Sequence, residues 1–114
     1  MIAFERRFVE AILSGKKTVT RRMWTRPLVE VGSIQAFVWK YSKEGIFANA
    51  KITQLARGKL GDITESEARK EGFKNLDELI EYFGKRWNPN REVWIVSFRV
   101  QDKNPREISQ ETMR

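Results

Sequence analysis

The stretch Gly15–Arg22 reads GKKTVTRR and marks the point where a predicted helix gives way to a predicted strand. Glycine readily adopts the left-handed backbone that commonly ends a helix, so Gly15 is the expected stop. The segment that follows, Thr18–Met23, is rich in β-branched residues and therefore favours a strand. Four cations and two hydroxyl groups are concentrated in these eight residues, which makes the stretch the first candidate for a functional site.

The segments on either side of this stretch also have clear patterns. Phe4–Leu13 precedes it as a predicted short helix, because its apolar residues recur at helical spacing. Ile34–Tyr41 is a predicted strand with apolar residues on both faces, which favours burial on both sides. Ser42–Gly45 is the expected hairpin turn, and Ile46–Leu55 is the expected returning strand.

Two helices and a last strand complete the predicted fold. The pairs Thr64 and Glu67, and Asn75 and Glu78, each match a capping box, so a helix is expected to begin at each pair. Glu92–Val100 is the last predicted strand. This order of elements predicts an α+β fold, a small mixed β-barrel with flanking helices.

The length of the chain fits one compact domain with a core of its own. We expect residues 1–101 to form this domain and residues 102–114 to form a polar C-terminal tail. No segment approaches the ~20 apolar residues that a membrane-spanning helix needs. The expected location is therefore cytoplasmic, with no membrane partner.

The chain contains no cysteine and no histidine. This excludes disulfides, thiol nucleophiles, zinc–cysteine sites and the usual general base near neutral pH. There is also no dense cluster of carboxylates for a magnesium ion, so we expect neither a metal nor a cofactor. Any reaction must use lysine, threonine, arginine, carboxylates or tyrosine.

The net charge is +7, and most of the surplus lies in the first half of the chain. Residues 1–60 carry 12 Lys and Arg against 4 Asp and Glu, whereas residues 61–101 carry 7 against 8. Such a surplus predicts an anionic partner, for which nucleic acid is the first choice. A basic surface that serves only solubility is the competing interpretation.

Four short motifs follow one another along the chain. They are Gly15-x-Lys17-Thr18-x-Thr20-x-Arg22 after the first helix, Gly32-Ser33 at the start of a strand, Asp62-Ile63-Thr64 followed by Glu71-Gly72-Phe73, and a closing strand with Trp94 and Phe98. In this order they resemble the ASCH domain family, whose fold is a PUA-like β-barrel. The resemblance covers roughly residues 4–100 and leaves out the tail.

The closest resemblance is to small single-domain ASCH proteins that include the amidohydrolases of N4-acetylcytidine. The resemblance implies that Lys17, Thr20 and Glu71 form the catalytic set and that the ligand is RNA or a modified nucleoside. The chain departs from those enzymes by a longer Trp24–Gly32 loop and by its tail, and either difference could change the substrate.

Amide hydrolysis by this set requires a base for the threonine hydroxyl. A neutral lysine can serve if burial and neighbouring cations lower its pKa, whereas Glu71 could relay a proton or oppose this by holding Lys17 charged. In a regular strand Lys17 and Thr20 point to opposite faces. The two side chains can therefore converge only if Lys17 lies in the turn before the strand.

Three hypotheses remain open from the sequence. The first is the amidohydrolase. The second is a PUA-like module that binds RNA without turnover, and the third is an adaptor whose basic face meets an acidic protein. The residues expected to bind substrate or RNA are Lys16, Arg21, Arg22, Trp24 and Arg26, besides Lys17.

Several of these residues also have purely structural interpretations. Both threonines of the motif could be ordinary strand residues. Arg22 could anchor a phosphate or a carbonyl group, or it could form an ion pair with Glu71. Trp24 could stack on a base or pack as part of a lid.

Overall fold

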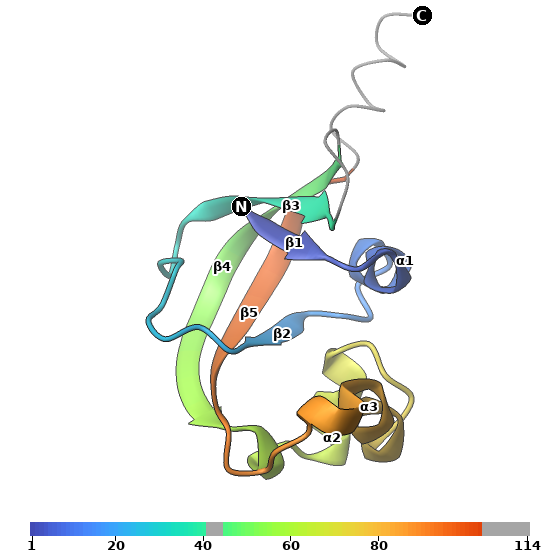
Figure 1. The fold of residues 1–114 in the computed structure, drawn as a ribbon. Coiled ribbons are helices and arrows are strands. Elements are labelled where there is room, and N and C mark those ends of the chain that lie inside the picture. The colour runs from blue at the N-terminus through green and yellow to red at the C-terminus, as the bar shows by residue number, and fades with distance from the viewer. Residues whose placement is uncertain (41–44, 104–114) are drawn as a thin grey trace, which may run out of the picture.

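The computed structural model describes residues 1–40 and 45–103, and these form one curled sheet with helices beside it (Figure 1). The five strands are β1 (Ile2–Phe4), β2 (Val19–Arg22), β3 (Ile34–Trp39), β4 (Ile46–Lys59) and β5 (Glu92–Lys103). The three α-helices are α1 (Val9–Leu13), α2 (Glu65–Lys70) and α3 (Leu76–Phe83). Short 3-10 turns occupy Arg6–Phe8, Leu60–Asp62 and Gly84–Arg86. The predicted α+β class is confirmed.

The sheet is mixed, and its strands lie in the order β1-β3-β4-β5-β2. β1 pairs with β3 in parallel, and the other three pairings are antiparallel. The ladder between β4 and β5 is the longest and curls the sheet into a half-barrel (Figure 1). Consequently β1 and β2 are the two edge strands and face each other across the open side of the barrel.

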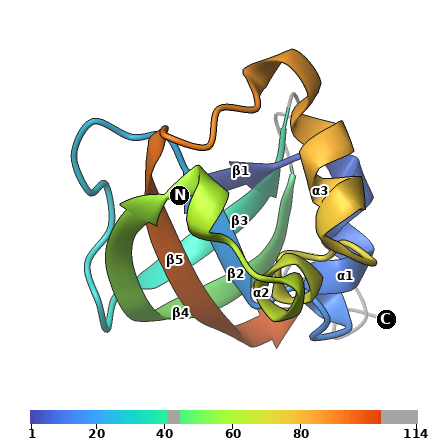
Figure 2. The ribbon, with the colours of Figure 1, turned by 90° about the horizontal axis from the view of Figure 1, so that it is seen from below.

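The core lies between the curled sheet and the helices, which gather on one side of the molecule (Figure 2). Phenylalanines from four different strands meet there, namely Phe4, Phe37, Phe47 and Phe98. The ring of Phe37 lies 4.8 Å from the rings of both Phe4 and Phe98. β1 is only three residues long, and these contacts join it to the centre of the sheet.

Three signals for the ends of helices are confirmed. Thr64 Oγ1 accepts a hydrogen bond from Glu67 N at 3.2 Å, and Asn75 Oδ1 accepts one from Glu78 N at 2.8 Å. Gly15 has φ +83°, the left-handed backbone expected at the end of α1. Local sequence therefore decides where α2 and α3 begin and where α1 ends.

Other sequence predictions are wrong in part. Phe4 belongs to β1, so the segment predicted as one helix from Phe4 to Leu13 begins with a strand end and a 3-10 turn. β4 extends through Lys59, four residues beyond the predicted end, because β5 supplies a partner along its whole length. The outer face of β3 is not buried, and Ile34 is 55% exposed. The helices cover the other side of the sheet and leave this face to solvent.

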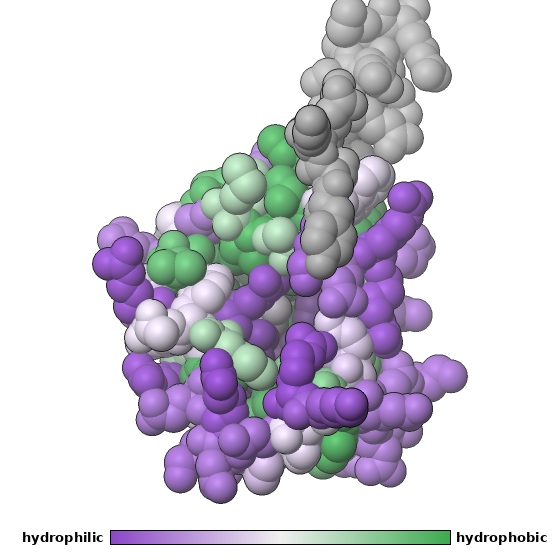
Figure 3. All heavy atoms as spheres, in the orientation of Figure 1, coloured by the Kyte–Doolittle hydropathy of each residue, from purple (hydrophilic) through white to green (hydrophobic). Residues whose placement is uncertain are grey.

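Hydrophilic side chains cover most of the face shown in Figure 3, and hydrophobic ones gather in its upper part. The exposed large apolar side chains are Met1, Leu28, Val31, Ile34 and Ile46. Within the described ranges, no helix has the length and apolar character to cross a bilayer.

Two sequence predictions fall on residues outside the described part. The expected hairpin turn at Ser42–Gly45, except for Gly45 itself, and the end of the strand at Tyr41 fall on residues 41–44. The predicted tail falls mostly on residues 104–114, whereas Asp102 and Lys103 belong to β5.

Candidate active site

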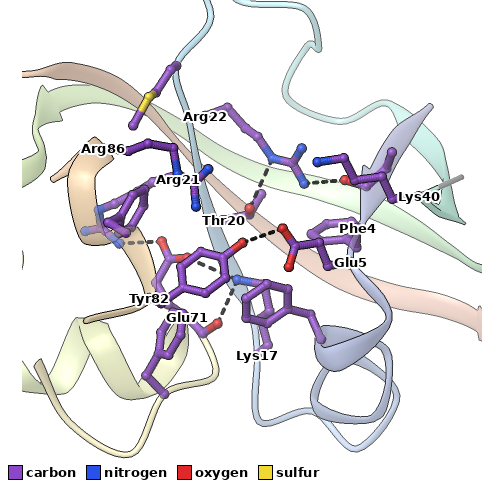
Figure 4. Close-up of a pocket in the computed structure, with 15 residues that line it drawn as sticks. Phe4, Glu5, Lys17, Thr20, Arg21, Arg22, Lys40, Glu71, Tyr82 and Arg86 are labelled. Atoms are coloured by element: carbon purple, nitrogen blue, oxygen red, sulfur yellow. Dashed lines mark hydrogen bonds and ion pairs between the residues drawn. The ribbon is translucent and has the colours of Figure 1, made fainter. Parts of the chain in front are cut away.

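A cavity of about 310 Å³ opens between the two edge strands, where the half-barrel is not closed by backbone hydrogen bonds (Figure 4). β1 and the residue after it supply Ala3, Phe4 and Glu5, and β2 supplies Thr20, Arg21 and Arg22. Lys17, Glu71 and Tyr82 also line it. The cavity therefore joins side chains from the GKKTVTRR stretch to side chains more than fifty residues away.

Lys17 lies in the segment that connects α1 to β2, after the turn at Gly15 and before the strand begins, so its side chain does not follow the alternation of β2. The residue is 3% exposed. Its Nζ donates hydrogen bonds to Val19 O at 2.9 Å, to Glu71 O at 2.7 Å and to Glu71 Oε1 at 3.0 Å. Three acceptors match the three N–H groups of an ammonium ion, so these hydrogen bonds favour the charged form, whereas burial opposes it.

Glu71 ends α2 and turns its carboxylate into the cavity. Oε1 accepts from Lys17, and Oε2 accepts from Arg21 Nη1 at 2.7 Å. Arg21 also pairs with Glu67, one helical turn earlier in α2. The ion pair that the sequence suggested between Arg22 and Glu71 is thus formed by Arg21 instead, because Arg21 lies on the α2 side of β2.

Arg22 and Thr20 share one face of β2 and are hydrogen-bonded to each other. Arg22 Nε donates to Thr20 Oγ1 at 3.2 Å, and Arg22 Nη2 donates to Ala3 O of β1 at 2.8 Å. The guanidinium group lies 4.7 Å from the centre of the Phe4 ring. Arg22 therefore bridges the two edge strands beside the threonine hydroxyl.

Opposing effects act on the pKa of Lys17. Burial lowers this pKa from its ordinary value of 10.5, and the positive charges of Arg22 and Arg21 lower it further. The carboxylate of Glu71 raises it but does not cancel the effect of burial. The net direction is downward, which is the direction that a lysine base needs.

Sequence reasoning did not identify the opposite wall of the cavity. Tyr82 of α3 donates its hydroxyl hydrogen to Glu5 Oε1 at 2.8 Å, and Figure 4 shows this pair beside Lys17 and Thr20. Burial, followed by the bond to Glu5, raises the pKa of Tyr82. Helical periodicity gave no signal for Tyr82, because it does not distinguish a side chain that lines a cavity from one that packs in the core.

The other predicted binding residues do not all meet at this cavity. Arg21 and Arg22 line it, whereas Lys16 is exposed and lines a different hollow. Trp24 is half-buried and packs against the core, and Arg26 is exposed in the loop after β2. In the described ranges, no group of three or more acidic, histidine or cysteine side chains could hold a metal ion.

Several curated relatives of the chain share one name, N(4)-acetylcytidine amidohydrolase. The N(4)-acetylcytidine amidohydrolase of Shigella boydii is 26% identical over 98 residues, which are 86% of this chain and 93% of that protein. The amidohydrolase of the same name from Haemophilus influenzae is 28% identical over 99 residues, or 87% and 93% of the two chains. The one from Citrobacter koseri is 29% identical over 98 residues, or 86% and 93%. No family model matches the chain.

Solved structures show the same fold. The ASCH domain of Lactobacillus crispatus superimposes with a TM-score of 0.66 at 18% identity, covering 81% of this chain and 69% of that one. The ASCH protein of Zymomonas mobilis gives 0.62 at 20% identity, covering 96% and 75%. The chain has the ASCH fold, and the resemblance predicted from its sequence is confirmed.

Proposed function

We propose that this ASCH-fold protein is an amidohydrolase that removes the acyl group from N4-acylated cytidine in the cavity between β1 and β2. Lys17 is the base, Thr20 is the nucleophile and Glu71 is the carboxylate that stabilises protonated Lys17. Arg22 binds the oxygen of the acyl group. The names of the curated relatives support the reaction class.

One observation carries the assignment of the three residues. Lys17, Thr20 and Glu71 are the polar or charged residues that are buried as whole residues in the described ranges, and the side chain of Arg21, which pairs with Glu71, is 3% exposed as well. Burial of charged groups is costly, and buried charged groups with perturbed pKa values are concentrated at functional sites. All three line one cavity that is large enough for a small ligand.

The first half of the proposed reaction forms an acyl-enzyme. Neutral Lys17 takes the proton of the Thr20 hydroxyl while Oγ1 attacks the acyl carbon, and the carbonyl oxygen becomes an oxyanion beside Arg22. The new ammonium ion is held by Glu71 Oε1, 3.0 Å away. The C–N bond then breaks, and Lys17 returns the proton to the N4 amine of the departing cytidine.

The second half releases the acid. A water molecule attacks the acyl carbon and gives a proton to Lys17. The C–O bond to Thr20 then breaks, and Thr20 Oγ1 takes this proton from Lys17. Cytidine and a carboxylic acid are the products, and the enzyme returns to its starting state. Neither step needs a group other than those of the chain, the substrate and water.

The alternative is an RNA-binding module without turnover. The net charge of +8 in residues 1–60 supports it. Its predicted cations are divided between different places, however. Arg21 is engaged by Glu71 and Glu67, and Arg22 is engaged by Thr20 and Ala3, all inside the molecule. Paired cations of this kind suit a closed site better than an open phosphate track.

The test is incubation of the protein with N4-acetylcytidine and other N4-acylated cytidines, followed by separation of cytidine from substrate. We expect turnover by the wild type and losses of about 100-fold or more in kcat for Lys17→Ala, Thr20→Ala and Glu71→Ala. Turnover that survives all three changes would reject the site. No turnover on any acylated nucleoside, together with salt-sensitive RNA binding, would favour the module.

A further inference from the structure

A second hollow, of about 570 Å³, lies outside the candidate active site and is strongly basic. Four cations line it, one from the turn after α1, two from the end of α2 and one from the loop before α3. They are Lys16, Arg69, Lys70 and Lys74, accompanied by the hydroxyl-bearing Ser66. None of the described residues that line this hollow carries a carboxylate.

The lack of acidic lining follows from how α2 and its C-cap residue use their carboxylates. Glu67 pairs with Arg21 and Glu71 pairs with Lys17 and Arg21, both toward the active-site cavity. Glu65 accepts a hydrogen bond from Leu76 N at the start of α3. Every carboxylate of this helix and its cap is thus engaged elsewhere, and its basic residues are left facing the hollow.

The four cations have no ion-pair partner anywhere in residues 1–40 and 45–103. Like charges gathered on one concave surface repel one another and raise the local concentration of anions. The negative end of the α2 dipole attracts cations and explains Arg69 and Lys70. It does not explain why Lys16 and Lys74, which belong to other segments, face the same space.

The basic hollow and the active-site cavity share a wall. Lys17 and Glu71 line the cavity, whereas their neighbours Lys16 and Gly72 line the hollow. Thr18 N donates to Lys70 O at 2.8 Å and fixes the two segments of this wall against each other. Phe73 borders both spaces.

We propose that the basic hollow binds phosphate groups of a single-stranded nucleic acid, so that the substrate is an acylated cytidine within a nucleotide chain. This inference rests on the proposed function for the chemistry at the base, but the binding of phosphate is independent of turnover. Guanidinium and ammonium groups around a hydroxyl are the donors that phosphate oxygens accept. The active-site cavity takes the modified base, and the basic hollow holds the backbone of neighbouring nucleotides.

The test compares two triple variants that remove the same charge. Arg69→Gln/Lys70→Gln/Lys74→Gln removes three of the four cations that line the basic hollow and leaves the proposed catalytic residues intact. Lys51→Gln/Lys59→Gln/Arg91→Gln is the matched control, because these cations lie on or beside β4 and β5 and line neither space. Fluorescence anisotropy with an unmodified single-stranded RNA oligonucleotide measures binding over a range of salt.

For the hollow variant we expect binding of the oligonucleotide to weaken about tenfold or more at low salt. Loss of three phosphate contacts should flatten the slope of log affinity against log salt by about 2, since each contact to a single strand contributes roughly 0.7. The control variant should keep nearly the wild-type slope. Equal losses in both variants would show that only net charge matters and would overturn the proposal, as would no loss in either.

Measuring kcat/KM on three substrates separates this proposal from the proposed function. The substrates are N4-acetylcytidine, its 5′-monophosphate and an oligonucleotide with one central N4-acetylcytidine. We expect the hollow variant to lose kcat/KM on the oligonucleotide and to keep it on the nucleoside. A loss on the monophosphate equal to that on the oligonucleotide would assign the hollow to a free nucleotide. Binding of polyglutamate, but not of RNA, through the hollow would assign it to an acidic protein and contradict the proposal.

Discussion

Lys17 Nζ lies 3.0 Å from Glu71 Oε1 and 2.7 Å from the backbone oxygen of the same residue, across 54 positions of sequence. The turn after α1 is thereby joined to the end of α2 by a buried charged contact. Arg21 completes the group from β2 by pairing with the second carboxylate oxygen. One carboxylate thus balances two buried cations and holds three elements together.

The stability of the fold should depend on this carboxylate. Glu71→Gln removes the counter-charge of Lys17 and Arg21, so the free energy of unfolding should fall by about 3 kcal/mol. Glu92→Gln is the matched control, because its pair with Arg57 is largely exposed and should contribute about 0–1 kcal/mol. Urea denaturation measures both. Equal changes in the two variants would contradict the buried role of Glu71.

The hydroxyl of Thr20 should be replaceable only by another hydroxyl. Thr20→Ala should lower kcat about 100-fold or more, whereas Thr20→Ser keeps a nucleophile and should retain activity within about tenfold. Thr18→Ala provides the control, because Thr18 lines a different hollow and should act like the wild type. Mass spectrometry of a quenched reaction should find the acyl group on Thr20. Full activity of Thr20→Ala would exclude it as the nucleophile.

The pH dependence of kcat/KM should follow the base form of Lys17. Below the lowered pKa of this residue the amine is protonated, so activity should fall about tenfold for each pH unit of acidification. The alkaline plateau should begin below pH 10.5, the ordinary value for lysine. Arg22→Met removes a positive charge that lowers this pKa. The pH at which kcat/KM begins to fall should therefore move to a higher value. An unchanged acidic side of the kcat/KM profile in Arg22→Met would argue against Lys17 as the titrating group.

Tyr82 should keep its proton to unusually high pH. Burial and the hydrogen bond to Glu5 raise its pKa above the ordinary 10.0, which a spectrophotometric titration can detect because the chain has two tyrosines. The step in absorbance at the highest pH should disappear in Tyr82→Phe and remain in Tyr41→Phe. Glu5→Gln should move it to lower pH, because the carboxylate that opposes the phenolate is gone. A step at the highest pH that survives Tyr82→Phe would contradict this assignment.

Much of the secondary structure follows from local sequence. The stop at Gly15 and the caps at Thr64 and Asn75 depend on hydrogen bonds and backbone angles within a few residues. The errors arose where a partner distant in sequence decides the outcome. β4 extends to Lys59 because β5 pairs with it, and β1 exists because its residues pair with β3. No pattern in either segment alone contains that information.

By itself, the sequence determined the fold class, the likeness to ASCH proteins and the end of the first helix at Gly15, since these depend on local propensity and on motif order. It did not determine which arginine pairs with Glu71, that Tyr82 and Glu5 line the cavity, or that Lys16 faces a separate basic hollow. Only the tertiary structure decided these points. The reason is physical: the curl of the sheet and the packing of the helices set the direction of each side chain, and the pairing of buried charges depends on that direction.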